Sequence, residues 1–368
     1  MRNKLRESNM ELLRILAMVF IVIFHYIYKS NFQYTELTVN NLFIKSGWFL
    51  GELGVNLFML ITGYYLCKSK TSIKKIIILI LEVWFYNFLN CFIDYQMGNK
   101  EIFDDLTIFF PIITGRYWFI TAYLLIYGLS NYFNKLISML KKRDYQKFLF
   151  INLLFWCFIP TVFGLFYNSS ESLPFYNRFI WLSVVYFIGA YIRIYNIKFF
   201  NSKVKSLIVS SLTFILMLLS IIFIDSFKDI FREIGTRETA YFWTTNNLLM
   251  VILSISIFMF FRNLNIKSNT VINTVSSTTL GVYLLHDGIL NRRIWLDLFK
   301  NDIFIYNSYW YFYVIMATVI IFGLGVIIDL LRQLLEKITV KKIINFNIWP
   351  NLYYKVKKKG LKIIDKLF

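Results

Sequence analysis

Histidine, cysteine and proline are scarce in this 368-residue chain, with 2, 3 and 4 copies. The cysteines are odd in number and show no CxxC spacing, so the sequence indicates neither a disulfide framework nor a metal site. Linkers, low-complexity tracts and internal repeats are also lacking. We therefore expect one domain with no appended soluble catalytic unit. Pro160 alone lies inside a long apolar segment, where we expect it to kink a helix.

Hydrophobic residues are abundant, at 58% of the chain with a mean hydropathy of +0.57. They gather in blocks of about 20 residues, which is the length needed to cross the hydrocarbon core of a bilayer. The sequence therefore predicts an all-α integral membrane protein, a polytopic bundle of about ten transmembrane helices. We place the spans at 11–28, 50–67, 75–93, 117–137, 148–167, 179–196, 206–225, 247–262, 270–290 and 309–331.

Acidic residues are half as frequent as basic ones, 21 against 40, and the net charge is +19. A basic balance can indicate nucleic-acid binding, but the positions of the charges argue against it. Of the 40 lysines and arginines, 28 lie in the N-terminus, the C-terminus and every second loop. Positive residues mark the cytoplasmic side of a membrane protein. We therefore predict cytoplasmic N- and C-termini, an even number of spans and no nucleic-acid partner.

The two ends of the chain differ in character. The first apolar block is too long for a signal peptide and lacks a small-residue cleavage site, so we expect it to remain as a span. Residues 332–368 are basic and amphipathic, with lysines interleaved with aromatic and aliphatic residues. We expect residues 1–331 to form the transmembrane domain. The tail would lie on the cytoplasmic leaflet and contact membrane lipids, as a plain anchor or with a regulatory role.

The first span carries two polar residues, Arg14 and His25, that a bilayer tolerates only for a reason. Eleven residues at ~100° and ~1.5 Å each place them on one helix face, about 16 Å apart. A histidine there is suited to general-base catalysis or to a structural hydrogen bond between helices. Arg14 has two plain alternatives, because it can pair with Glu11 at i−3 or extend to the interface.

Four segments together resemble the acyltransferase 3 family of membrane acyltransferases, in particular bacterial members that O-acetylate surface polysaccharides. The segments are NMELLRILAMVFIVIFHY (9–26), GELGVNLFMLITGYYL (51–66), RYWFITAYLLIYGLSNYFNKLI (116–137) and TTLGVYLLHD (278–287). The resemblance implies a bundle of about ten helices. It also implies cytoplasmic acetyl-CoA, or another acyl-CoA, as donor, and a glycan hydroxyl as acceptor.

The family's Arg-x10-His signature matches Arg14 and His25 residue for residue. The resemblance implies that Arg14 positions the donor and that His25 acts on the acceptor hydroxyl or carries the acetyl group. Many members have an arginine pair at the cytoplasmic entrance of the third span. Lys74 and Lys75 stand there in this chain, so the resemblance implies that they bind the phosphates of the donor. Lysine binds phosphate as a point charge but lacks the bidentate fork of arginine.

His286 and Asp287 are further candidate catalytic residues, and they end the ninth predicted span, on the same side of the membrane as His25. A carboxylate can fix a histidine tautomer and stabilise its imidazolium. Adjacent residues on a helix diverge by about 100°, so we do not expect Asp287 to serve His286. It would serve His25 if the two spans touch. The alternative is a helix-terminal polar pair at the interface.

Other polar and aromatic residues are candidates for substrate binding. We select Asn56, Tyr64, Tyr117 and Trp118. Trp118 suits a platform for the apolar face of a sugar, although aromatic residues also gather at membrane interfaces. Asn56, Tyr64 and Tyr117 are candidate hydrogen-bond donors to the tetrahedral intermediate of acyl transfer.

Taken together, these observations predict a multi-pass O-acyltransferase of a bacterial cytoplasmic membrane. It would transfer acetyl from acetyl-CoA to a hydroxyl of a cell-surface or lipid-linked polysaccharide, without a metal. The alternative is a transporter or flippase of lipid-linked glycans, which would need no acyl-CoA and often shows internal repeats.

Overall fold

The structure is a computed structural model that describes residues 6–33, 36–167, 171, 173, 176–234 and 240–338. This part of the chain is helical and contains no β-strand. The longer helices are α1 (Ser8–Tyr28), α3 (Trp48–Leu66), α4 (Ile73–Gln96), α5 (Trp118–Met139), α6 (Lys142–Leu153), α8 (Arg178–Tyr195), α9 (Lys203–Ser226), α11 (Leu248–Arg262) and α15 (Trp310–Ile338).

Shorter helices connect or extend them. They are α2 (Val39–Ser46), α7 (Ile159–Phe163), α10 (Lys228–Glu233), α12 (Thr270–Ser276), α13 (Thr279–His286) and α14 (Asn301–Phe304). Single turns of 3₁₀ or π geometry are η1 (Ile102–Asp104), η2 (Leu106–Phe109), η3 (Leu154–Phe158), η4 (Gly164–Tyr167), η5 (Lys198–Asn201), η6 (Tyr241–Trp243) and η7 (Arg293–Leu298).

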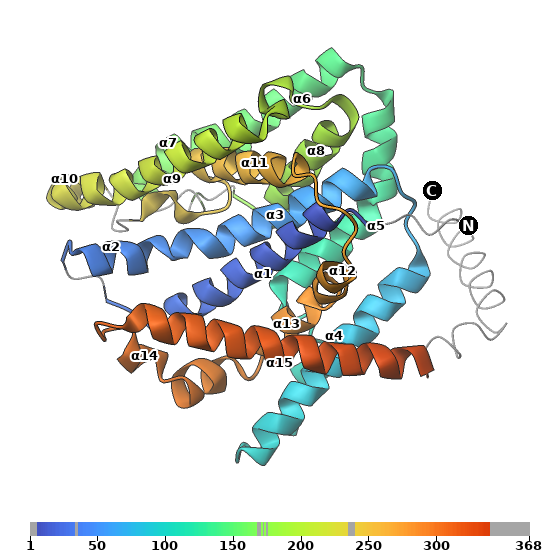
Figure 1. Ribbon diagram of the computed structural model, residues 1–368, viewed down its shortest axis with the longest axis vertical. Helices are drawn as coiled ribbons and strands as arrows, with labels where there is room; N and C mark the ends of the chain where they lie inside the picture. The colour runs from blue at the N-terminus through green and yellow to red at the C-terminus, as the bar shows by residue number, and fades with distance from the viewer. Residues whose placement is uncertain are drawn as a thin grey trace.

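Helix α1 lies in the middle of the bundle, between α3 and α15 (Figure 1). It also contacts α11, α12 and α13, so it has neighbours on nearly every side. On the far side of α3 lies α8, and α9 packs on α11. Helices α4 and α5 run at a steep angle to α1 (Figure 1). Glu11 and His25 on α1 are accordingly buried among these helices.

Glycines allow α3 to approach its neighbours closely. A Cβ on Gly54 would lie 2.7 Å from the Ala17 carbonyl oxygen of α1, and one on Gly63 would collide with the Tyr186 carbonyl of α8. On the facing helix, a Cβ on Gly189 would collide with the Leu60 carbonyl of α3. Small residues at such crossings permit the short backbone separations of membrane bundles. The glycines of α3 thus serve helix packing.

Within the described residues, seven segments are long and apolar enough to cross a membrane: Ser8–Tyr28, Val39–Leu66, Ile73–Gln96, Lys142–Phe166, Arg178–Tyr195, Lys203–Ser226 and Trp310–Ile338. Helix α11 is apolar but has only 15 residues. Helix α5 has 22 residues and is not among the seven. The structure confirms a helical protein with several candidate spans. Ten spans are not confirmed, and the orientation of the termini stays a prediction.

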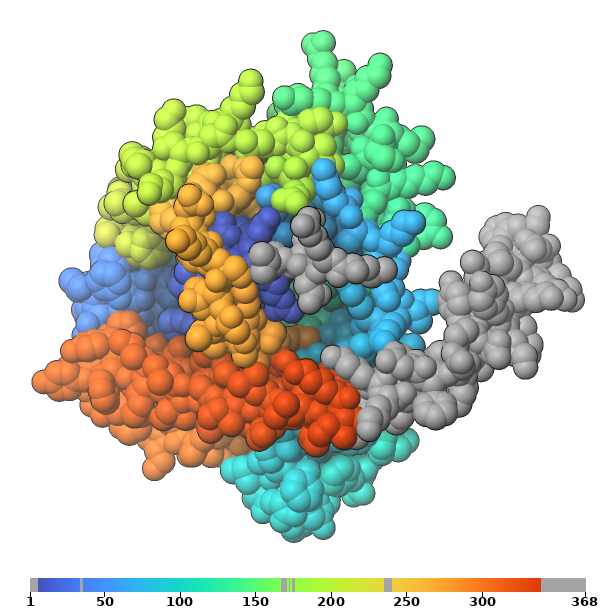
Figure 2. Space-filling view, turned by 45° about the vertical axis from the view of Figure 1, so that its right-hand side comes forward, coloured from blue at the N-terminus to red at the C-terminus, as the bar shows by residue number. Residues whose placement is uncertain are grey.

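The predicted span at 270–290 is not continuous. It is divided into α12 and α13 at Ser277 and Thr278. The hydroxyls of Ser277, Thr278 and Thr279 each donate to a backbone carbonyl three residues earlier. Such local bonds compete with the regular helical pattern. The orange segment that includes α12 lies between α11 and α15 (Figures 1 and 2).

Two further predictions concern Pro160 and the C-terminal tail. The turn before Pro160 is a π turn, Leu154–Phe158, which accommodates the distortion that a proline introduces. Helix α15 continues through residue 332, and Arg332 is held inside the bundle by Asp329 and Glu82. The rest of the predicted tail, 339–368, lies outside the described residues.

Candidate functional site

One large cavity, of about 1280 Å³, follows α1 along most of its length. Arg14, Met18, Ile21, His25 and Tyr28 line it. Their spacing of 4, 3, 4 and 3 residues defines one face of a helix. The predicted common face of Arg14 and His25 is therefore the face of α1 that borders this cavity. We call its two parts the His25 end and the Arg14 end.

At the His25 end, three polar residues from α1 and the end of α13 come together. His25 Nδ1 lies 2.9 Å from His286 Nε2, and His25 Nε2 lies 4.0 Å from Asp287 Oδ1. The other ring nitrogen of His286, Nδ1, lies 2.6 Å from the carbonyl oxygen of Val282. His25 and Asp287 line the cavity, whereas His286 is fully buried behind them. The cavity therefore meets the Nε2 side of His25.

The end of α13 explains how two adjacent residues both reach His25. Asp287 has φ −115° and ψ 67°, so the chain leaves the helix immediately after His286. The 100° divergence of neighbouring helical side chains no longer applies there. Asp287 lies near His25, which is the first of the two alternatives that the sequence left open. His286 also contacts His25, which the sequence did not predict.

The His25 end carries a second charged group beside an aromatic wall. Arg178 pairs with Glu171 at 2.6 Å and lies 3.7 Å from Glu52 Oε1. Its guanidinium carbon is 4.7 Å from the centre of the Trp118 ring, a cation–π distance. Glu52 is buried, and its Oε2 has no hydrogen-bond partner among the described residues.

An aromatic cluster lines the cavity near this group. Phe24 stacks on Tyr28 at 5.1 Å, and Trp243 lies 6.3 Å from Tyr28, between ring centres. All three rings border the cavity, as does Trp118. Four connecting segments at this end supply lining residues, among them Lys29, Arg116, Trp243 and Asn291. The His25 end thus combines apolar ring faces with charged groups.

The Arg14 end is rich in cations. Arg6, Arg14, Lys68, Lys75 and Arg193 line it. The carboxylates that line the cavity in the described part of the chain are Glu52, Glu82 and Asp287. Glu52 and Asp287 belong to the His25 end, and Glu82 pairs with Arg332 at 3.1 Å. The Arg14 end therefore favours an anion such as a phosphate.

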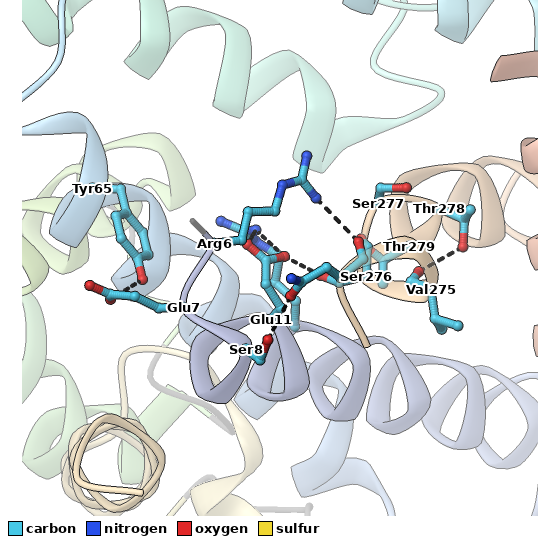
Figure 3. A network of polar contacts seen from close by, with 12 residues as sticks. Arg6, Glu7, Ser8, Glu11, Tyr65, Val275, Ser276, Ser277, Thr278 and Thr279 are labelled. Atoms are coloured by element: carbon cyan, nitrogen blue, oxygen red, sulfur yellow. Dashed lines mark hydrogen bonds and ion pairs between the residues drawn. The ribbon is translucent and has the colours of Figure 1, made fainter. Parts of the chain in front are cut away.

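Arg14 itself is paired. Its guanidinium donates to both oxygens of Glu11, at 2.8 and 2.7 Å, and Ser276 also donates to Glu11. Figure 3 shows Glu11 beside α12, with Tyr65 donating to Glu7 nearby. The Arg14 side chain is still 30% exposed and borders the cavity. The pairing that the sequence offered as an alternative exists, and it leaves part of Arg14 open to a ligand.

The two predicted donor-binding lysines do not occupy equivalent places. Lys75 lines the cavity, and Lys74 does not. Both belong to the first turn of α4, where adjacent side chains point in different directions. Lys68, just after α3, and Arg193, at the end of α8, share the Arg14 end with Lys75.

Three predicted substrate residues do not reach the cavity. Asn56 donates to the Thr245 carbonyl and accepts from Trp181, so its amide joins α3 to α8 and the start of α11. Tyr64 accepts from Arg193 at the opposite end of α3 from Glu52. Tyr117 is fully buried beside the Leu284 carbonyl. Of the four candidates, the structure brings only Trp118 to the cavity.

Other residues that line the cavity were not predicted from the sequence. Tyr283 borders the cavity and presents its ring edge-on to His286, with centres 6.3 Å apart. It precedes Asp287 by one helical turn in the same motif, which is a signal that could have found it. Arg178 directly precedes the predicted span 179–196 and Arg193 lies in its last turn, and basic residues are common at such span ends. Only the fold shows that both border this cavity.

Comparison with protein families settles the broad assignment. The family model described as an acyltransferase domain, acyltransferase 3, matches residues 7–328. The chain belongs to the acyltransferase 3 family. It is therefore a membrane acyltransferase, as the four segments indicated. No curated protein and no solved structure in the comparisons matches it.

Proposed function

We propose that this acyltransferase transfers acetyl from cytoplasmic acetyl-CoA to a hydroxyl of a cell-surface or lipid-linked polysaccharide. The observation that carries the proposal is that one cavity joins a cationic end to His25, whose Nδ1 contacts His286 and whose Nε2 side borders the cavity. A coenzyme A thioester has the same polarity: a phosphate-rich nucleotide, then a long arm, then a neutral reactive carbonyl.

The cationic end suits the donor. Arg14, Lys68, Lys75 and Arg193 come from four helices or their ends and line the same cavity. Arginine offers a fork to phosphate oxygens and lysine offers a point charge. From Arg14 to His25 the helix rises about 16 Å, a distance that an extended pantetheine arm can cover.

His25 is suited to the transfer step. Its Nε2 would remove the proton of the acceptor hydroxyl as the oxygen attacks the thioester carbon. A tetrahedral intermediate forms, the carbon–sulfur bond breaks, and the imidazolium returns the proton to the departing thiolate. Asp287 Oδ1, 4.0 Å from Nε2, would stabilise the transient imidazolium. Tyr283 and Asn291 line this end and are candidates to donate to the oxyanion.

The His25 end suits a sugar. Phe24, Tyr28, Trp118 and Trp243 present ring faces and edges to the cavity, and Glu52 and Arg178 offer charged hydrogen-bonding groups beside them. Carbohydrates have apolar faces that pack on aromatic rings, and hydroxyls that bond to carboxylates and guanidinium groups. This combination supports a glycan acceptor. In the two-sided arrangement that we propose, this end opens outside the cytoplasm.

The test uses cells that make the protein and its surface polysaccharide. Membrane vesicles from wild-type cells should transfer label from radioactive acetyl-CoA to the polysaccharide fraction, and proton NMR of the glycan should show acetyl signals. Vesicles with His25→Ala should transfer none, and their glycan should lack those signals. Unchanged acetyl signals in the variant would refute the role of His25. Transport of glycan without any use of acetyl-CoA would instead support the transporter alternative.

A further inference from the structure

His286 is fully buried, borders no part of the cavity and still contacts the histidine to which the chemistry is assigned. The two are the only histidines in the chain. We propose that His286 is a positioning residue that fixes the tautomer of His25, so that the lone pair of His25 Nε2 faces the cavity. This inference rests on the proposed function only for its effect on rate.

The first step is the contact between His286 and Val282. A backbone carbonyl oxygen can accept a hydrogen bond but cannot donate one. His286 Nδ1 lies 2.6 Å from the Val282 oxygen, so Nδ1 carries the proton and donates. In a neutral imidazole, a proton on one nitrogen leaves a lone pair on the other. His286 Nε2 is therefore an acceptor.

In the second step, the lone pair on His286 Nε2 determines which nitrogen of His25 carries the proton. Its Nδ1 lies 2.9 Å from His286 Nε2, and one of the two nitrogens must donate. Because His286 Nε2 holds a lone pair, His25 Nδ1 carries the proton. Nε2 of neutral His25 then has a lone pair, on the side where Asp287 and the cavity lie. That lone pair serves equally a general base and a nucleophile that carries an acetyl group.

The opposite arrangement would need a charged His286, with protons on both nitrogens. Its ring is enclosed edge-on by Tyr283 and Trp295, with ring centres at 6.3 and 5.9 Å. A charge in such a setting is costly unless a partner compensates it. The carboxylate in this group, Asp287, faces His25 Nε2. The same rings hold the His286 plane in place.

The arrangement resembles a catalytic triad in which His286 takes the place of the carboxylate. In hydrolase triads a carboxylate accepts the Nδ1 proton of the catalytic histidine and so fixes its tautomer. Here a neutral imidazole takes that place, oriented by a carbonyl of its own helix. The carboxylate lies on the other side, near Nε2.

The experiment uses full-length protein labelled with ¹⁵N-histidine, in lipid nanodiscs at neutral pH. Two histidines give two pairs of ring-nitrogen signals, and a His25→Gln variant, with only His286 left, assigns them. We expect both rings protonated at Nδ1 and unprotonated at Nε2. A proton on His25 Nε2 in the wild type would overturn the proposal, whatever the protein's activity.

Two substitutions of His286 test the effect on rate. In His286→Gln, a side-chain carbonyl near the former Nε2 position can still accept from His25, whereas His286→Leu removes the acceptor. We expect His286→Leu to move the His25 proton from Nδ1 to Nε2. Acetyl transfer from acetyl-CoA by membrane vesicles should fall about 10²-fold or more in kcat, with KM for acetyl-CoA nearly unchanged.

His286→Gln should keep the Nδ1 proton and a clearly larger share of kcat. An unchanged His25 tautomer in His286→Leu, or equal losses in both variants with intact folding, would overturn the positioning role. If His286→Leu does not fold, the wild-type and His286→Gln spectra still decide the proposal. If the wild type shows no acetyl transfer, the proposed function fails, and the tautomer is still measured.

Discussion

The His25 end and the Arg14 end of the cavity each carry a polar residue of α1, but the surroundings of the two residues differ. At the His25 end each nitrogen of His25 has a separate environment: His286 at Nδ1, and Asp287 with the open cavity at Nε2. At the Arg14 end the charge of Arg14 is balanced by Glu11, and the attraction for an anion is spread over several cations. The His25 end thus suits chemistry at one ring nitrogen, whereas the Arg14 end suits binding of an anion whose charge is spread over several atoms.

This difference predicts unequal consequences of mutation. A single change at the His25 end should abolish chemistry, whereas single changes at the Arg14 end should weaken binding by degrees. The largest effect is expected for His25→Gln, which removes the base and should lower kcat for acetyl transfer by about 10²- to 10⁴-fold. The measurement is transfer of radioactive acetyl by membrane vesicles with equal amounts of folded protein.

Tyr26→Phe is a matched control for His25→Gln. Tyr26 is the next residue of α1, it is fully buried, and it does not border the cavity. Its hydroxyl has no hydrogen-bond partner among the described residues, so removing it breaks no contact and should leave kcat within about a factor of 3. Equal losses in the two variants would show that α1 is sensitive to any change, and the special role of His25 would fall.

Asp287→Asn should have a smaller effect than His25→Gln. The substitution keeps the shape and removes a negative charge 4.0 Å from His25 Nε2. Two unit charges at that distance interact by about 4 kcal/mol at an effective dielectric of ~20, an upper bound here. We expect kcat to fall by about 10- to 10²-fold, through loss of imidazolium stabilisation. A rate equal to that of the wild type would assign Asp287 to structure alone.

Arg14→Ala distinguishes the two uses of Arg14. If Arg14 holds the donor, KM for acetyl-CoA should rise by about 10-fold or more, because a hydrogen bond to a charged group contributes ~1.5–3 kcal/mol. Folded protein should remain, as measured by detergent size-exclusion chromatography. Glu11→Gln is the companion variant, because it breaks the same pair and leaves Arg14 in place. Loss of folded protein in both would make the pair structural.

Much of this site was predictable from sequence, and the two ends again differ. The Arg14–His25 face follows from helix periodicity, and α1 has that face on the cavity. The proximity of Asp287 required only that two spans touch. The contact of His286 was not predictable, because it depends on the break of α13 directly after His286. If residues 270–290 formed one continuous helix, the side chains of His286 and Asp287 would point in different directions.

Tyr64 shows an error of a different kind. Successive spans alternate in direction, so late residues of α3 lie at the opposite end of the bundle from late residues of α1. Tyr64 contacts Arg193, and its neighbour Tyr65 contacts Glu7 before α1. The predicted topology already implied this location. Asn56 and Tyr117 are different, because their burial between helices depends on side-chain packing that no periodicity encodes.

The smallest effect, and the sharpest contrast, is expected for the adjacent lysines of α4. Lys75 borders the cavity and Lys74 does not, although the sequence predicted the same donor-binding role for both. Removing one partly exposed charge costs about 0.5–1 kcal/mol, so Lys75→Gln should raise KM for acetyl-CoA by about 2- to 5-fold and leave kcat unchanged. Lys74→Gln should leave both constants as they are. The ratio of the two KM values isolates position from charge, because the variants have identical composition. Equal KM values would mean that the cations act only through long-range attraction, and that the donor does not occupy the cavity beside Lys75.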